Sequence, residues 1–121
     1  MHHFPYPERA PLDPAFLHAL DIRFGADCHV TEGVRRQHGR SEAHFAETLP
    51  DAVVFVATTQ DVADCVTLCA RYGVPVVPWG AGTSIEGNAL PIRGGVSLDM
   101  SRMDRIVAVN AADFDCTVEA G

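Results

Sequence analysis

The sequence contains no uninterrupted apolar stretch long enough to cross a membrane. No run approaches the roughly 18 consecutive apolar residues that a spanning helix requires. The first residues, MHHFPYPERAPLD, also lack the apolar centre of a secretory signal. These two absences predict a protein with no membrane span, and we expect a cytoplasmic location.

Positive charge is also scarce. Nine basic residues stand against sixteen acidic ones, which gives a formal net charge of −7. Because a phosphate backbone attracts positive surfaces, this balance argues against a DNA or RNA partner. Hydrophobic residues make up 47% of the chain and charged residues 21%, as in ordinary globular proteins. The 121 residues are enough for one domain with a core, but few for a large cofactor and a separate substrate pocket.

The four cysteines lack the spacing of a zinc site or a redox pair. They are Cys28, Cys65, Cys69 and Cys116, with no CxxC motif among them. An unpaired cysteine behaves as a small apolar side chain, so we expect buried free thiols.

The histidines are confined to the first part of the chain: His2, His3, His18, His29, His38 and His44. His38 and His44 share a polar segment with two glutamates, but the spacings match no metal site, and we expect solvated side chains and no metal. The segment HGRSEAHF, residues 38–45, is a candidate for contacts with the remainder of a longer protein.

Residues 1–49 are predicted to form a helical and irregular N-terminal arm. Asp13 is a suitable N-cap ahead of Pro14, and the helix that begins there should end near Phe24, with Gly25 as its stop. A second helix is expected to begin at Thr31.

Residues 50–121 show strands alternating with a helix. The β-branched run 52–57 predicts a strand covered on both faces, and 74–78 predicts a second buried strand. Between them, Thr58 and Thr59 offer N-cap hydroxyls and Gly73 a helix stop, so the three elements form a βαβ unit with parallel strands. Further strands are expected over 95–100, 106–110 and 116–120, the last two as a hairpin. A strand at the end of the chain suggests a fragment of a longer protein.

A glycine-rich loop follows the second of these strands. In VVPWGAGTSIEGNALP, residues 76–91, Gly80, Gly82 and Gly87 flank Thr83 and Ser84. Glycines permit close approach and positive φ, so successive backbone N–H groups can converge on an anion, and the two hydroxyls add donors. A phosphate or pyrophosphate is the natural ligand, although three glycines alone also fit an ordinary surface turn.

Two common nucleotide motifs are excluded by what the loop lacks. Gly82 and Gly87 have P-loop spacing, but Asn88 and Ala89 stand where Lys and Ser or Thr are needed. A dinucleotide fingerprint needs a glycine at position 85, which is Ile85, and a helix directly afterwards. The loop itself must therefore hold the anion.

The whole pattern resembles the p-cresol methylhydroxylase type of FAD-binding domain, over residues 35–121. The matching residues are Pro78, Gly80, Gly82, Thr83, Ser84, Gly87, the strand start 94–96, the turn 101–106 and the strand end 118–121. The similarity is closest to the FAD-linked D-lactate dehydrogenase and glycolate oxidase branch, and it includes HGRSE at 38–42. The implied fold is the N-terminal subdomain of that domain, an α/β (α+β) fold with a small, mostly parallel sheet and flanking helices, incomplete at its C-terminus.

The resemblance implies a cofactor site for FAD. Its residues would be Pro78, Trp79, Gly80, Ala81, Gly82, Thr83, Ser84, Gly87, Asn88, Ser101 and Met103. Relatives that attach FAD covalently use a histidine in this loop, and here Ala81 and Thr83 occupy that region, so noncovalent FAD is expected. For Trp79, packing is the favoured role over stacking on the cofactor. Close relatives often have Gly at the positions of Ser84 and Asn88.

The implied activity is oxidation of a small 2-hydroxy acid, such as D-lactate or glycolate, by hydride transfer to FAD. No catalytic residue is assigned, because the family places its base and its substrate-binding arginine later in the protein. The fragment alone is expected to be inactive, and the full-length protein could be a dimer. The alternative is a noncatalytic α/β binding or interaction module in which the glycine loop is structural.

Overall fold

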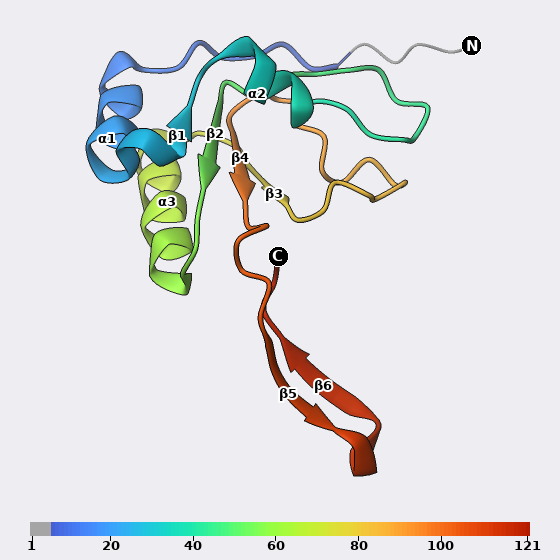
Figure 1. Cartoon of the computed structure of the whole chain (residues 1–121). Helices are drawn as coiled ribbons and strands as arrows, with labels where there is room; N and C mark the ends of the chain where they lie inside the picture. The colour runs from blue at the N-terminus through green and yellow to red at the C-terminus, as the bar shows by residue number, and fades with distance from the viewer. Residues whose placement is uncertain (1–5) are drawn as a thin grey trace.

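A computed structural model describes residues 6–121 as a mixed α/β body with a separate projecting hairpin (Figure 1). The body holds a four-stranded sheet in the order β1-β2-β4-β3. Its strands are β1 (Cys28–His29), β2 (Ala52–Phe55), β3 (Val76–Trp79) and β4 (Val96–Asp99). The start of the predicted N-terminal arm, with His2 and His3, lies outside the described residues.

The helices begin where the sequence predicted, and the two longer ones also end there. In α1 (Pro14–Phe24), the Asp13 side chain accepts a hydrogen bond from the backbone N–H of Ala15. The short α2 (Glu32–Gln37) starts after Thr31. Helix α3 (Thr59–Tyr72) begins with a capping box between Thr58 and Asp61 and ends at Gly73, whose φ of 65° suits a residue without a Cβ. Two 3₁₀ turns, η1 (Gly25–Asp27) and η2 (Ala111–Asp113), complete the set.

The sheet is mostly parallel, as predicted, but its strand order differs from a simple βαβ pair. Strands β2 and β3 do not pair with each other, because β4 lies between them and pairs parallel with both. The strands of the predicted βαβ unit are therefore parallel, but they do not pair with each other directly. Strand β1, which pairs antiparallel with β2, was not predicted, because two residues carry no periodic signal.

One face of the sheet packs against α1 and α3, which lie together on the same side (Figure 1). Fully buried side chains of this core include Phe16, Leu20, Val54, Val96 and Cys65. Because side chains alternate along a strand, Val96 and Leu98 face this core while Ser97 and Asp99 face the opposite side, toward α2.

Strand β3 corrects a second expectation. The run 74–78 was predicted to be buried, but β3 is an edge strand whose residues are half-buried, with Pro78 exposed. Because proline has no backbone N–H, it cannot donate a hydrogen bond to a second neighbouring strand. An edge strand, which has only one neighbour, accommodates it.

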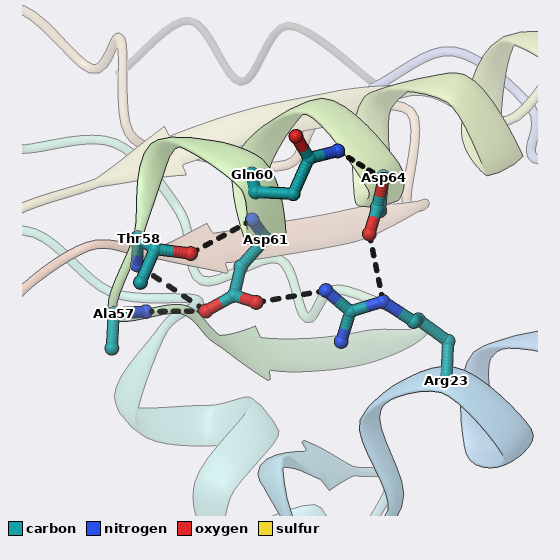
Figure 2. A network of polar contacts seen from close by, with 6 residues as sticks. All are labelled: Arg23, Ala57, Thr58, Gln60, Asp61 and Asp64. Atoms are coloured by element: carbon teal, nitrogen blue, oxygen red, sulfur yellow. Dashed lines mark hydrogen bonds and ion pairs between the residues drawn. The ribbon is translucent and has the colours of Figure 1, made fainter.

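A polar network joins α1 to the start of α3 (Figure 2). The Arg23 guanidinium lies 2.8 Å from both Asp61 and Asp64. Asp61 also accepts hydrogen bonds from the backbone N–H groups of Ala57 and Thr58. Arg23 first, and these amides next, hold the pKa of Asp61 below its usual value. The network thus ties the helix cap to the neighbouring helix.

The cysteines are free, but not all are buried. Cys65 and Cys69 lie in the core, and their mutual hydrogen bond and burial raise the pKa of Cys65 well above its ordinary value. Burial raises the pKa of half-buried Cys28 to about 11. Cys116 is exposed, so the expectation of burial was wrong for this residue, which lies on the projecting hairpin.

That hairpin comprises β5 (Ile106–Asn110) and β6 (Asp115–Val118), paired antiparallel as predicted. It extends away from the body (Figure 1), and every residue of both strands is exposed. Over residues 6–121, no helix combines the length and apolar character needed to span a bilayer.

Candidate cofactor-binding loop

The glycine loop leaves the sheet at the carboxyl end of β3 and returns to the amino end of β4. In open α/β sheets, ligands bind beyond the carboxyl ends of parallel strands. The predicted residues 78–84, 87 and 88 lie in this one segment, with Ala81, Thr83 and Asn88 exposed. The loop is therefore accessible at the edge where this class of fold places its ligands.

Two glycines in the loop rest on aromatic rings of the same chain. Gly82 and Gly87 have φ values of 70° and 75°. A Cβ at Gly82 would overlap Cζ2 of Trp79, and one at Gly87 would lie 2.8 Å from Cε2 of Phe45. The sequence pattern indicated that these glycines allow a ligand to approach, and the structure shows a further reason for them, the close packing of the loop on two side chains.

The first half of the loop has unused hydrogen-bond donors. Within the described chain, the backbone N–H groups of residues 80–85 donate to no carbonyl or side chain. The Ser84 hydroxyl donates to Asn88 Oδ1 and accepts from the N–H of Glu86 at 3.4 Å. A row of free amides with no acidic side chain hydrogen-bonded to it fits an anionic group such as a diphosphate.

Beneath the loop lies a buried histidine–carboxylate pair that the sequence did not reveal. His38 Nε2 lies 2.7 Å from Asp99 Oδ2, and both side chains are almost fully buried. Burial alone would raise the pKa of Asp99, but hydrogen bonds from His38 and from the Ser101 N–H outweigh it and hold that pKa below its usual value. The expectation that His38 is solvated was therefore wrong. Its partner is 61 positions away, so no local pattern could signal the pair.

The rest of the segment 38–45 also lies against this chain. Phe45 supports Gly87, and the Thr48 N–H donates to the Gly39 carbonyl at 2.9 Å. Its predicted role was contact with a remainder of the protein. The structure shows that part of the segment packs under the glycine loop, and contact of the rest with further chain stays a prediction.

The two predicted residues after β4 take different positions. Ser101 is exposed, and its N–H donates to Asp99 Oδ1 at 2.8 Å. The Met103 side chain is buried in the core, so any effect it has on a ligand acts through the position of the turn. Trp79 packs against His38, with ring centroids 4.8 Å apart. Among residues 6–121 no group of three or more His, Cys, Asp or Glu could hold a metal ion.

A small α/β sheet with an open, amide-lined glycine loop at its carboxyl edge defines a nucleotide-binding class of protein. Residues 50–121 match the family described as FAD binding domain. The chain belongs to this FAD-binding domain family, which confirms the predicted family and makes FAD its cofactor.

Three similar proteins are named as enzymes of 2-hydroxy-acid oxidation. The mitochondrial D-lactate dehydrogenase [cytochrome] of Arabidopsis thaliana is 43% identical over 69% of this chain and 15% of its own length. The probable mitochondrial D-lactate dehydrogenase of Danio rerio is 38% identical over 76% and 18%. Glycolate oxidase subunit GlcD of Bacillus subtilis is 32% identical over 62% and 16%. The chain thus spans less than a fifth of these relatives, and their names give no support to the noncatalytic alternative.

Solved structures show the same fold. An alkyldihydroxyacetonephosphate synthase matches 98% of this chain and 26% of its own, with a TM-score of 0.74 and 21% identity. p-Cresol methylhydroxylase matches 82% and 21%, with a TM-score of 0.60 and 17% identity. At these identities the likeness concerns the fold alone, and it confirms the predicted fold class.

The relatives correct the expected location. Both eukaryotic proteins above are named as mitochondrial, which overturns the prediction of a cytoplasmic protein. That prediction rested on the missing apolar centre of a secretory signal. Mitochondrial targeting segments are amphipathic and rich in arginine and serine, so this test does not detect them.

Proposed function

We propose that this chain supplies the diphosphate-binding loop for FAD in a flavoenzyme that oxidises a small 2-hydroxy acid, such as D-lactate or glycolate. The observation that carries the proposal is the row of unpaired backbone N–H groups over residues 80–85. The names of the relatives support the substrate class.

The proposed site comprises Pro78, Trp79, Gly80, Ala81, Gly82, Thr83, Ser84, Gly87, Asn88, Ser101 and Met103. The backbone of residues 80–85 and the hydroxyls of Thr83 and Ser84 would bind the diphosphate. Trp79 and the residues after β4 would support the site by packing. FAD supplies the hydride-accepting chemistry, and this chain binds and orients it. The loop contains no histidine, which supports noncovalent attachment.

The remaining parts of the proposal concern the full-length protein. The catalytic base and the substrate-binding arginine would lie outside this chain. A division into an arm of residues 1–49 and a domain of residues 50–121 is supported by the start of the family match at residue 50. Dimerisation stays a prediction, which light scattering of the full-length protein would test.

The loop can be tested at a glycine that the fold itself does not require. Gly80 does not have a positive φ, and a Cβ there would have only one neighbour, the Gly121 carbonyl carbon at 3.8 Å. We expect Gly80→Ala in the full-length protein to keep its thermal stability but to weaken FAD binding about tenfold or more, because the methyl group occupies the path to the free amides. Quenching of flavin fluorescence on titration of the apoprotein measures this.

Gly33→Ala is the matched control. Gly33 also has open space around its Cβ position and no positive φ, but it lies in α2, outside the loop. Its substitution should leave FAD affinity unchanged. Equal affinities for Gly80→Ala, Gly33→Ala and the unsubstituted protein would refute the proposed role of the loop.

A further inference from the structure

The His38 imidazole is held between two atoms that can only accept hydrogen bonds. Nδ1 lies 2.9 Å from the carbonyl oxygen of Val34, and Nε2 lies 2.7 Å from Asp99 Oδ2. A carbonyl oxygen and a carboxylate oxygen have no hydrogen to give, so both ring nitrogens must carry one. A ring with two N–H groups is the imidazolium cation. Its place at the C-terminal end of α2, where the helix dipole is negative, favours the same charge.

The charged ring is connected to the glycine loop through Trp79. The His38 and Trp79 rings lie with centroids 4.8 Å apart at 50°, a distance at which a cation and an indole attract each other. Strand pairing places Trp79 beside Asp99, and the Met100 N–H donates to the Trp79 carbonyl at 2.8 Å. The backbone of Trp79 is therefore fixed by strand pairing, and its indole is held against the His38 ring.

The loop in turn rests on the indole. Gly82 lies so close to the six-membered ring of Trp79 that no Cβ could be added without moving the ring. A change in the indole position would therefore shift Gly82 and the free amides on either side of it. Phe55 also contacts the buried His38 ring edge-on, with ring centroids 5.8 Å apart.

We propose that His38 is a positioning residue for the glycine loop: as an imidazolium braced between Val34 and Asp99, it fixes the Trp79 indole and thereby the amides of residues 80–85. The loop's role in FAD binding is the proposed function above, on which this inference rests. The contacts of His38 thus connect the N-terminal arm, through α2, to the site at the edge of the sheet.

The charge on His38 is directly measurable. In full-length protein with ¹⁵N-labelled histidine, assigned by loss of signal in His38→Gln, both ring nitrogens of His38 should show a bonded hydrogen at neutral pH. In Asp99→Asn, the amide NH₂ can donate to Nε2, so one nitrogen should lose its hydrogen and the ring should become neutral. A neutral ring in the unsubstituted protein would overturn the proposal.

The positioning role is tested by FAD affinity. His38→Gln keeps a donor toward Asp99 but loses the charge and the donor to Val34, and we expect FAD binding about tenfold weaker at a temperature where the apoprotein is fully folded. The circular dichroism of the bound flavin should change as well, because the amides that orient it have moved. His44→Gln, the same change at an exposed histidine of the same segment, should alter neither.

Comparison with Gly80→Ala separates the two proposals. If Gly80→Ala weakens FAD binding while His38→Gln binds FAD as tightly as His44→Gln, the positioning role of His38 is refuted and the proposed function of the loop stands. If Gly80→Ala has no effect, the proposed function itself fails. Should His38→Gln fail to fold, the nitrogen spectrum of the unsubstituted protein still decides whether the brace carries its charge.

Discussion

The sheet body and the β5–β6 hairpin are built from the same kind of sequence but have opposite surroundings. Strand β2 (AVVF) and strand β5 (IVAVN) both consist mainly of valine and other apolar residues. In β2, residues 52–54 are fully buried, whereas every residue of β5 is exposed, including Ile106 at 70% and Val109 at 69%. An apolar β-branched run therefore predicts a strand but not its burial, which depends on what the rest of the chain places against it.

The two regions should also differ in what holds them together. Helices on both faces support β2, while a two-stranded hairpin alone is only marginally stable in water. The relatives are about four to five times as long as this chain, so their additional residues are available to cover such a hairpin.

The largest effect is expected from core truncation. Phe16, fully buried under α3, and Phe114, 98% exposed in the hairpin turn, allow the same substitution in both regions. Phe16→Ala should lower the free energy of unfolding by about 3–5 kcal/mol, because it removes buried surface and leaves a cavity. Phe114→Ala should change it by less than about 0.5 kcal/mol.

Denaturant unfolding of the 121-residue chain measures both values. Repeating the pair in the full-length protein sharpens the comparison, since a cost at Phe114 comparable to that at Phe16 would show that further chain buries the hairpin. If Phe16→Ala and Phe114→Ala lowered the free energy of unfolding equally in the 121-residue chain, the contrast between a buried body and an exposed hairpin would be contradicted.

The next largest effect is expected in the pH dependence of the unfolding free energy, through Asp99. The pKa of Asp99 is lowered in the folded state, so its ionisation contributes stability above about pH 4, and this contribution is lost as pH falls through the folded pKa. The gap in unfolding free energy between the unsubstituted chain and Asp99→Asn should therefore be wide at pH 7 and narrow by pH 3.

Glu119 provides the counterpart in the hairpin region. Arg105 likewise lowers its pKa, but the guanidinium is mostly exposed, so solvent and salt screen the pair. Glu119→Gln should give a small gap that closes when salt is added at pH 7. The buried and exposed pairs would not differ as described if salt reduced the difference in unfolding free energy for Asp99→Asn, or if that difference were large for Glu119→Gln.

The smallest effect is expected at Ser97. Its hydroxyl is fully buried and is the one buried side-chain polar atom of residues 6–121 without a hydrogen-bond partner. Ser97→Ala should be neutral or stabilise the chain by up to about 1 kcal/mol, because no bond is lost and a desolvated hydroxyl is removed. Thr48→Ala, which loses bonds to Arg9 and the Pro91 carbonyl, should instead destabilise it. Thermal unfolding measures both, and a destabilised Ser97→Ala would reveal a partner for that hydroxyl.

Local signals accounted for most of the elements. Asp13, Pro14 and Gly25 marked the ends of α1, and the loop around Gly82 was located correctly because glycine and hydroxyl residues follow a strand directly. These signals lie within a few residues of what they specify. Strand order, by contrast, depends on pairing between distant segments, and so the insertion of β4 between β2 and β3 could not be deduced.

The same distinction applies to the site. The amide-lined loop was predictable from its own residues, whereas the support beneath it was not. The contacts of His38 with Asp99 and of Phe45 with Gly87 join segments that are 61 and 42 positions apart (87 − 45 for the second pair). Histidine and phenylalanine in a polar segment gave no sign that folding would place them under a loop from the other half of the chain.

The central place of β4 imposes an order on assembly during translation. Strands β2 and β3 leave the ribosome before β4, and neither can satisfy its ladder groups with the other, because the strand that joins them has not yet been synthesised. Until residues 96–99 emerge, the nascent chain carries two open strand edges of the kind that chaperones and aggregating chains recognise. A pause in synthesis within the glycine loop would prolong that interval, so codon choice over residues 80–95 should influence the yield of folded protein.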